Sequence, residues 1–218
     1  MKAMILAAGR GARMQPITDT IPKPLLKVAG KPLIAHHLIT LARAGIAEVV
    51  INISHLAEKI QQELGDGQHY NIKIHYSHEP IALETGGGIL QALPLLGTTP
   101  FLVVSGDIWT DYPWQQLPQQ LENDLAHLIM VDNPSYHVTG DFVLQQGKLQ
   151  HEGGAKLTFA SMGVYHPKLF AGAPSGAFRL TKLLDPAIAA GKVSGEHYHG
   201  NWANVGTEEE WHKLIARL

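Results

Sequence analysis

The stretch KAMILAAGRGARMQPITDTIPKPL occupies residues 2–25 and determines the fold expected for the rest of the chain. It opens with Lys2–Ala8, a short apolar run that ends at a glycine, and this pattern predicts a buried strand rather than a helix. Gly9 and Gly11 follow directly, with Arg13 two residues further on. Backbone N–H groups exposed by glycines, next to a guanidinium group, are typical of a phosphate-binding loop. The stretch therefore predicts a strand that leads into a phosphate site.

A strand followed by Gly-x-Gly also occurs in dinucleotide-binding folds. The third glycine of that fingerprint is missing here, because Met14 stands in its place. Pro16 argues against a long helix that begins at Gly11, since a proline inside a helix removes a hydrogen bond. We therefore favour another kind of phosphate loop over that of a dehydrogenase.

A lysine between two prolines stands ten residues after Arg13. Pro22 fixes its own backbone angle φ, and Pro24 favours an extended backbone at Lys23. The ammonium group is thus carried by a restricted backbone before any ligand arrives. A rigid surface turn is the alternative interpretation. The position of the lysine, in the same connection as the glycine-rich loop, favours a second cation in one site.

The first half of the chain alternates apolar strands with amphipathic helices. A helix with a proline in its first turn is predicted at Pro32–Ala44, with Gly45 after its end. The elements predicted after it are a strand at Glu48–Ile53, a helix at Leu56–Leu64, a strand at Ile72–Tyr76, a helix at Gly88–Leu93 that Pro94 stops, and a strand at Phe101–Ser105. This order predicts an α/β fold with a mostly parallel central sheet, covered by helices on both faces.

After about residue 125 the alternation gives way to strands with few helices between them. The predicted strands are Ala126–Val131, Asp141–Leu144, Lys148–His151 and Lys156–Tyr165. They indicate a small antiparallel annex to the central sheet. A final helix is predicted at Thr207–Leu218, where Thr207 and Glu210 match a capping box. A chain of 218 residues favours one domain, 1–218, with the change of pattern dividing it into halves 1–125 and 126–218.

Composition excludes several classes of protein. The chain has 17 basic and 19 acidic residues and a net charge of -2, so we expect no nucleic-acid partner. No apolar run approaches the roughly 18 residues that a membrane span needs, so we expect no membrane partner. The charged, glycine-rich segment directly after residue 8 argues against an export signal. Cysteine is absent, which excludes disulfides and thiolate metal sites and is compatible with the cytoplasmic location that we expect.

Two further kinds of residue are candidate metal ligands. Asp107 follows an apolar strand and a glycine, so its carboxylate should project over the carboxyl edge of the sheet, although an Asp there also caps turns. The chain has 13 histidines, of which His197 and His199 could share one strand face. The sequence offers this pair no third ligand and contains no H-E-x-x-H motif, so we expect surface or structural histidines rather than a zinc site.

Two motifs stand in order in the first connection: Leu6-Ala7-Ala8-Gly9-x-Gly11-x-Arg13-Met14-x-Pro16-Ile17-Thr18 and Pro22-Lys23-Pro24-Leu25. Together they resemble the signature of the sugar-1-phosphate nucleotidyltransferases. The resemblance extends over the whole chain, including Gly106-Asp107 and Asn204-Val205-Gly206, and is strongest to the short bacterial members that act on N-acetylmuramic acid 1-phosphate. It implies a Rossmann-like nucleotidyltransferase fold with a nucleotide-binding half at 1–125 and a sugar-binding half and closing helix at 126–218. The implied reaction joins a sugar 1-phosphate to a nucleoside triphosphate and releases pyrophosphate.

The resemblance also implies a role for individual residues. Arg13 and Lys23 would neutralise the phosphates, while Asp107 and Asn204 would hold Mg²⁺. Relatives usually carry aspartate where Asn204 stands. The neutral amide of Asn204 brings no charge to the metal, so Mg²⁺ binding should be weaker or pass through a water molecule. The residues implied to contact the nucleotide are Leu6, Ala8, Gly9, Gly11, Ala12, Arg13, Lys23, Glu79, Gly86 and Gly87. Those implied to contact the sugar are Ser105, Gly140, Glu152 and Gly163.

The sequence leaves the substrates open. The first hypothesis is transfer of UMP from UTP to N-acetylmuramic acid 1-phosphate, whose lactyl carboxylate would favour a nearby cation such as Arg179 or Lys182. The second is a glucose-1-phosphate or mannose-1-phosphate enzyme that uses UTP, dTTP or GTP. A non-catalytic nucleotide-binding regulatory protein is the third, and it predicts loss of the cationic pair, which is present. Both a monomer and a dimer are compatible with the sequence.

Overall fold

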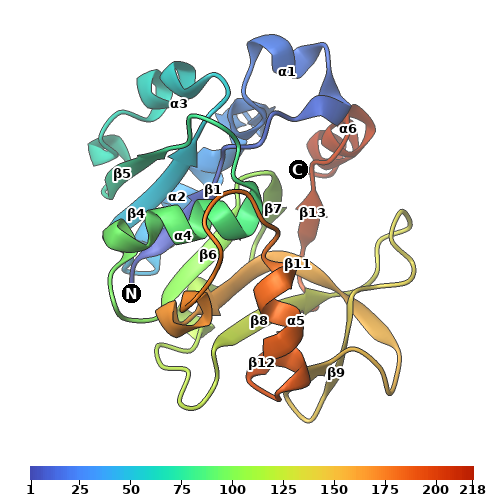
Figure 1. Ribbon diagram of the computed structural model, residues 1–218. Helices are drawn as coiled ribbons and strands as arrows, with labels where there is room; N and C mark the ends of the chain where they lie inside the picture. Colours follow the sequence, from blue (N-terminus) through green and yellow to red (C-terminus); the bar gives the residue numbers. More distant parts are fainter.

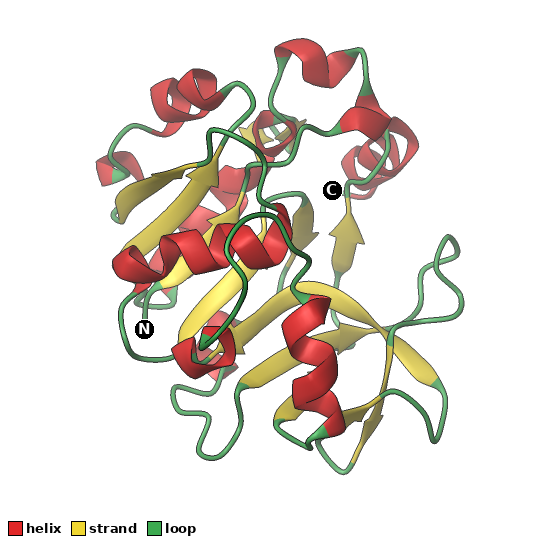
Figure 2. Cartoon of the chain, in the orientation of Figure 1, coloured by secondary structure: helices red, strands yellow, loops and turns green.

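The computed structural model describes residues 1–218, and a nine-stranded mixed sheet runs through all of it (Figures 1 and 2). The strands lie in the order β5-β4-β1-β6-β11-β8-β12-β10-β9. Their bounds are β1 Ala3–Leu6, β4 Glu48–Ile53, β5 Lys73–His78, β6 Phe101–Ser105, β8 Ala126–Val131, β9 Phe142–Gln145, β10 Lys148–Gln150, β11 Lys156–Tyr165 and β12 Val193–His197. Two short ribbons pair β2 (Lys27–Val28) with β3 (Lys31–Pro32), and β7 (Ile108–Thr110) with β13 (Trp202–Asn204).

Strands β5, β4, β1 and β6 form a parallel half, as predicted. Ile5 of β1 pairs with Ile51 of β4 on one side and with Val104 of β6 on the other. Because all four strands run the same way, their carboxyl ends meet at one edge of the sheet. The loops that follow β1, β4, β5 and β6 are therefore brought together there.

The predicted antiparallel annex is present as a continuation of the same sheet. β11 runs antiparallel to β6 on one side and to β8 on the other. Gly163 of β11 stands where a Cβ atom would lie 2.6 Å from the carbonyl oxygen of His127, so this close strand pairing requires glycine. β12 then pairs parallel to β8, and β9 and β10 close the far edge as a hairpin.

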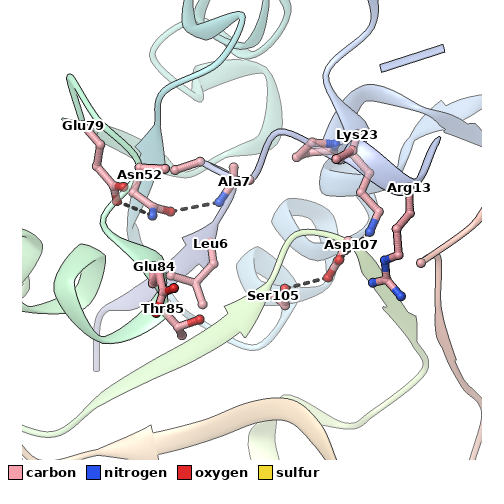
Figure 3. Close-up of a pocket in the computed structure, with 17 residues that line it drawn as sticks. Leu6, Ala7, Arg13, Lys23, Asn52, Glu79, Glu84, Thr85, Ser105 and Asp107 are labelled. Carbon is pink, nitrogen blue, oxygen red and sulfur yellow. Dashed lines mark hydrogen bonds and ion pairs between the residues drawn. The ribbon is translucent and has the colours of Figure 1, made fainter. Parts of the chain in front are cut away.

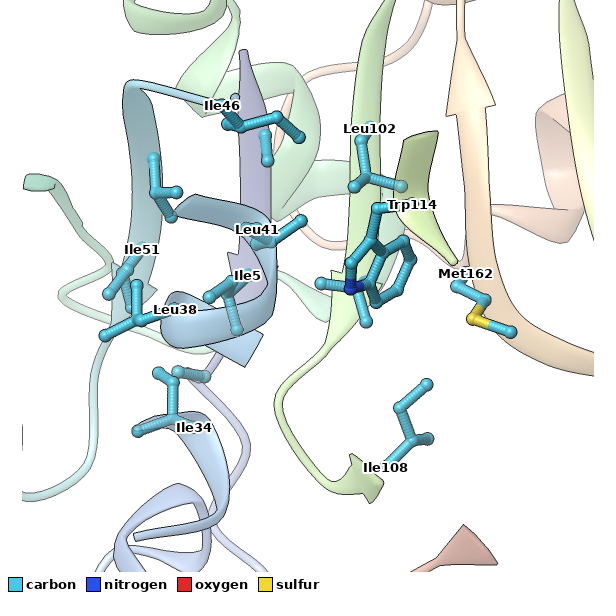
Figure 4. Packing of buried hydrophobic residues seen from close by; sticks show 14 of the residues in the cluster. Ile5, Ile34, Leu38, Leu41, Ile46, Ile51, Leu102, Ile108, Trp114 and Met162 are labelled. Carbon is cyan, nitrogen blue, oxygen red and sulfur yellow. The ribbon is translucent and has the colours of Figure 1, made fainter. Parts of the chain in front are cut away.

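Helices cover both faces of the sheet, and each face has its own apolar core. Their bounds are α1 Ile17–Thr20, α2 Leu33–Arg43, α3 Ala57–Leu64, α4 Glu84–Leu96, α5 Thr181–Ala189 and α6 Glu208–Arg217. On one face, Leu38 and Leu41 of α2 pack against Ile5 of β1 (Figure 4). On the other, α4 and α5 cover Met4 and its neighbours (Figure 1). Adjacent residues of β1 thus face opposite cores, as the pleat of a strand requires.

The chain departs from the predicted elements mainly in its helices. α4 begins at Glu84, before the predicted Gly88, and continues through Pro94 to Leu96. Its buried face, which includes Ile89 and Leu96, packs on the sheet and outweighs the cost of one missing hydrogen bond. The last helix is confirmed, with the backbone N–H of Glu210 donating to the Thr207 side chain. None of the helices has the length and apolar character needed to cross a bilayer.

Candidate active site

The carboxyl edge of the parallel half is hollowed into a cavity of about 370 Å³ (Figure 3). Its walls come from the ends of β1, β4 and β6 and from the segments that follow β1, β5 and β6, with one residue from beyond β13. The lining residues are Leu6, Ala7, Ala8, Gly9, Gly11, Ala12, Arg13, Lys23, Pro24, Asn52, Glu79, Ala82, Glu84, Thr85, Ser105, Asp107 and Gly206. Every residue that the sequence assigned to the phosphates therefore lies around one space.

The glycine-rich loop after β1 forms a tight turn over this cavity. Gly11 has φ of 70°, and its carbonyl oxygen accepts from the backbone N–H of Met14 at 2.8 Å and from the Thr18 hydroxyl at 2.9 Å. A Cβ atom at Gly11 would lie 2.9 Å from Thr18 Cγ2, so both the angle and the space require glycine. The turn continues into a 3₁₀-helix, Ala12–Met14, instead of the long helix that Pro16 argued against. Arg13 on this turn is exposed and forms no ion pair, so its guanidinium is free to bind an anion.

Lys23 differs from the sequence prediction in its backbone. It begins a 3₁₀-helix, Lys23–Leu25, instead of being extended, because Leu25 N–H closes a turn onto Pro22 O at 2.8 Å. Its side chain is buried and reaches Asp107, where Nζ lies 2.6 Å from Oδ2. The closed turn and this ion pair together outweigh the local preference that Pro24 imposes.

Asp107 is held from two sides at the end of β6. Lys23 contacts one carboxylate oxygen, and the Ser105 hydroxyl donates to the other at 2.6 Å. Burial alone would raise the pKa of Asp107, but the charge of Lys23 and the hydrogen bonds from Lys23 and Ser105 bring the pKa below its ordinary value. Asp107 is therefore a carboxylate at neutral pH, fixed in orientation beside the cavity.

Asn204 lies next to Asp107 through the β7–β13 ribbon. Asn204 pairs with Ile108, and the backbone N–H of Val205 donates to the carbonyl of Asp107 at 2.8 Å. The Oδ1 atom of Asn204 is buried and has no hydrogen-bond partner. A buried oxygen without a partner is costly, and Mg²⁺ prefers ligands of the carboxylate and carbonyl type. The two residues therefore carry the kinds of oxygen that Mg²⁺ binds, although Asp107 lines the cavity and Asn204 does not.

A chain of buried hydrogen bonds shapes the opposite end of the cavity (Figure 3). Asn52 Oδ1 accepts from the backbone N–H of Ala7 at 2.9 Å, and Asn52 Nδ2 donates to Glu79 at 2.7 Å. The second carboxylate oxygen of Glu79 accepts from the backbone N–H of Leu83 at 2.9 Å. These bonds tie the loop after β1 to the segment before α4. Asn52 is absent from the residues predicted from the sequence, although a polar residue inside the apolar strand Glu48–Ile53 signals buried partners.

The glycines at the start of α4 serve packing rather than lining the cavity. The backbone N–H groups of Gly86 and Gly87 both donate to the carbonyl of Phe178, at 2.9 and 3.2 Å. A Cβ atom at Gly88 would lie 2.5 Å from Glu79 Oε1. The wall of the cavity is formed instead by Glu84 and other residues that precede them. Gly86 and Gly87, predicted at the nucleotide, therefore hold the helix against its neighbours.

A second cavity of about 500 Å³ adjoins the first over the antiparallel half of the sheet. The two share Leu6, Glu84, Thr85 and Ser105. The residues that only the second cavity has are Val103, Phe159, Ser161, Tyr165, Arg179, Leu180, Thr181 and Leu184. Together the two hollows give the elongated space that a ligand with two parts would need.

Of the four residues predicted at the sugar, the structure places only Ser105 on these cavities. Gly140 packs against the backbone of Lys156, where a Cβ would lie at 2.8 Å, and Gly163 is enclosed between β6 and β8. Glu152 is exposed in the connection between β10 and β11. Phe159 and Ser161 line the second cavity instead. The strand pairing that places them there is long-range, so the local sequence gave no signal for it.

Comparison with known proteins gives the site its context. The family model described as Nucleotidyl transferase matches residues 2–138, which contain Arg13, Lys23 and Asp107. The chain belongs to the nucleotidyl transferase family. This nucleotidyltransferase is 48% identical to the N-acetylmuramate alpha-1-phosphate uridylyltransferase of Neisseria meningitidis serogroup B, over 95% of this chain and 94% of that protein. It is 33% identical to the protein of the same name from Caulobacter vibrioides, over 99% and 96% of the two chains.

Solved structures confirm the fold of this nucleotidyltransferase. A putative glucose-1-phosphate thymidylyltransferase from Bacillus anthracis, in complex with a sucrose, superposes with a TM-score of 0.89 at 20% identity. The match covers 100% of this chain and 94% of that one. HddC from Yersinia pseudotuberculosis, complexed with GMP-PN, gives a TM-score of 0.84 at 19% identity, over 99% and 98% of the two chains. The nucleotidyltransferase fold expected from the sequence is thus confirmed over the full length of the chain.

Proposed function

We propose that this nucleotidyltransferase transfers UMP from UTP to N-acetylmuramic acid 1-phosphate and releases pyrophosphate. The observation that carries the proposal is the meeting of Arg13, Lys23 and Asp107 around one cavity that opens into a second. Two relatives named for this reaction match nearly the whole chain, which supports the choice of substrates. A cytoplasmic location and a monomeric or dimeric state are part of the same proposal.

The reaction requires positioning and charge neutralisation rather than a general base. A phosphate oxygen of the sugar 1-phosphate is already anionic near neutral pH, and it would attack the α-phosphorus of UTP. The new P–O bond forms as the bond between the α-phosphorus and the bridging oxygen breaks, and the electron pair leaves with pyrophosphate. Two polyanions must approach for this, so cations that offset their repulsion supply most of the catalysis.

The two cations occupy different positions for this task. The exposed, unpaired guanidinium of Arg13 would bind the triphosphate and stabilise the charge on the departing pyrophosphate. The ammonium of Lys23 is buried and oriented by Asp107, so it would meet the α-phosphate and the incoming sugar phosphate. Because Lys23 is held in place before substrates arrive, little reorganisation is required during the reaction.

A magnesium ion is included in the proposal. Asp107 and Asn204 would hold it, the first by its carboxylate and the second by its unpartnered amide oxygen. When bound, the ion would supply positive charge to the phosphate oxygens of both substrates. Only one of the two protein ligands is charged, so binding would depend more on the phosphates than it would with two carboxylates.

The second cavity suits the sugar. It adjoins the phosphate site through Ser105 and Leu6, and its wall includes Arg179. The side chain of Arg179 is 83% exposed and lies 3.9 Å from Glu84, a distance that leaves it free to pair with another anion. The lactyl ether of N-acetylmuramic acid carries such an anion. Lys182, the other candidate, does not line the cavity.

The test is a matrix of substrates with pyrophosphate release as the readout. Purified protein with Mg²⁺ is given UTP, dTTP, GTP, CTP or ATP, each with N-acetylmuramic acid, N-acetylglucosamine, glucose or mannose 1-phosphate. We expect the highest kcat/KM for UTP with N-acetylmuramic acid 1-phosphate. Faster reaction with glucose or mannose 1-phosphate would assign the chain to another substrate, and nucleotide binding without pyrophosphate release would support a regulatory protein instead.

A further inference from the structure

A cluster of metal-ligating side chains lies outside the two cavities, at the ends of β8 and β12. It consists of Asp132, His197 and His199, whose ligand atoms all lie within 4.8 Å of one another. His197 Nε2 is 2.9 Å from Asp132 Oδ1, and the rings of His197 and His199 are 3.9 Å apart between centroids. None of the three lines either cavity of the proposed reaction.

Strand pairing explains why these residues meet. β8 and β12 run parallel and side by side (Figure 1), with His197 directly opposite Met130. Asp132 follows Met130 by two positions, and His199 follows His197 by two. Side chains two positions apart along an extended chain project to the same face. The sequence showed His197 and His199 as a pair without a third ligand, and the fold supplies Asp132 from a strand 65 residues away.

The segment that carries the histidines is anchored by its own hydrogen bonds. Tyr198, between the two histidines, donates its backbone N–H to Met130 at 2.8 Å and its hydroxyl to Asp111. Asp111 also accepts from the backbone N–H of Asn201 at 2.8 Å and from its side chain at 2.7 Å. These bonds hold the middle of the His197–His199 segment and the chain two residues after it. The three ligands are therefore presented together by a fixed backbone rather than by a free loop.

We propose that Asp132, His197 and His199 bind a divalent transition-metal ion of the Zn²⁺ type. Two imidazoles and one carboxylate suit zinc and its neighbours, whereas Mg²⁺ prefers oxygen ligands alone. The ion would replace the contact of 2.9 Å between His197 Nε2 and Asp132 Oδ1. Asp132 and His199 are exposed and His197 is partly buried, so solvent would complete the coordination. This site is separate from the proposed magnesium site and does not depend on the proposed reaction.

Such an ion would tie together two strands and the segment that leads to the active site. Asp132 comes from the end of β8, and the histidines come from the end of β12. Asn204 lies five residues after His199, in β13. Because the ion binds only where the three ligands are assembled, it stabilises the folded state over the unfolded chain. We therefore expect Zn²⁺ to raise the thermal unfolding temperature.

The experiment measures Zn²⁺ binding by titration calorimetry on protein without a polyhistidine tag, in excess Mg²⁺. The variants are Asp132→Ala and His199→Ala, both at exposed side chains, so that folding is preserved. The matched control is His212→Ala, because His212 also lies 3.5 Å from a carboxylate, that of Glu208, but belongs to no group of three ligands. Thermal unfolding with and without Zn²⁺ is recorded for each protein.

We expect the wild-type chain and the His212 variant to bind one equivalent of Zn²⁺. The Asp132 and His199 variants should bind it at least about tenfold more weakly, since even partners outside the coordination shell change metal affinity by about 10- to 100-fold. Zn²⁺ should raise the unfolding temperature of the wild-type chain and the His212 variant, and should raise that of the Asp132 and His199 variants less. Equal binding by all four proteins would show adventitious attachment to scattered histidines and would overturn the proposal. Absence of Zn²⁺ binding by the wild-type chain would overturn it as well.

Discussion

Replacing Lys23 with alanine removes the cation that the account places closest to the reacting phosphates. The side chain is 10% exposed, and its Nζ lies 2.6 Å from Asp107 Oδ2, so the ammonium group is held in a fixed position beside the cavity. Losing one such preorganised contact lowers kcat by about 10²- to 10³-fold, or roughly 3–4 kcal/mol. Lys23→Arg should not restore activity, because a planar fork differs in shape from a point charge.

The same substitution has a smaller effect on stability. Asp107 keeps the hydrogen bond from Ser105 but loses its charged partner, which costs about 1.5–3 kcal/mol for a hydrogen bond to a charged group. The assay is pyrophosphate release at saturating substrates, with thermal unfolding recorded for each protein. Lys27→Ala is the matched control, since Lys27 lies four residues further on and is exposed. A Lys23→Ala protein with the turnover of the Lys27 control would refute the role given to Lys23.

Three further predictions concern other parts of the molecule. Asn204→Asp adds a charge where the buried amide oxygen has no partner, so the Mg²⁺ concentration for half-maximal activity should fall; an unchanged metal dependence would show that Asn204 is not a ligand. Gly88→Ala places a methyl group 2.5 Å from Glu79, and should lower the free energy of unfolding in urea by about 1–3 kcal/mol, whereas a neutral result would contradict the packing described. Burial lowers the pKa of His37 from 6.5 to about 4, despite its hydrogen bond to Ile108. The unfolded chain therefore takes up the proton first as the pH falls, and the free energy of unfolding should fall by about 3 kcal/mol between pH 6.5 and 4. His37→Gln should flatten this pH profile, and an equal slope in both proteins would contradict the role given to His37.

Much of the fold could be predicted because its strands are continuous apolar runs. Glu48–Ile53, Phe101–Ser105 and Ala126–Val131 were predicted with the bounds that the structure shows, since buried strands carry few polar residues. α5 could not be predicted, because Pro186 stands inside it and packing on the sheet outweighs that local signal. The β7–β13 ribbon has three residues in each strand, too few for a periodic pattern, and its pairing is long-range.

Some residues of the candidate site could also be predicted from the sequence, and others could not. Arg13 and Asp107 stand in the turns that follow β1 and β6, and Lys23 directly follows Pro22, so their positions depend on local turns that the sequence specifies. Asn52 could be interpreted only with partners 45 and 27 residues away. Glu152 is exposed in the connection between β10 and β11 and lines neither cavity, so its predicted contact with the sugar stays a prediction. Residues that local turns position could thus be predicted, whereas contacts between residues far apart along the chain could not.

A crystal structure with Mg²⁺ and a non-hydrolysable analogue of UTP tests the central claim most directly. The account predicts the triphosphate against the turn at Gly11–Arg13, with Lys23 beside the α-phosphate and the uridine toward Asn52. Density for the triphosphate outside the cavity that these residues line, at any position beyond reach of both Arg13 and Lys23, would contradict it.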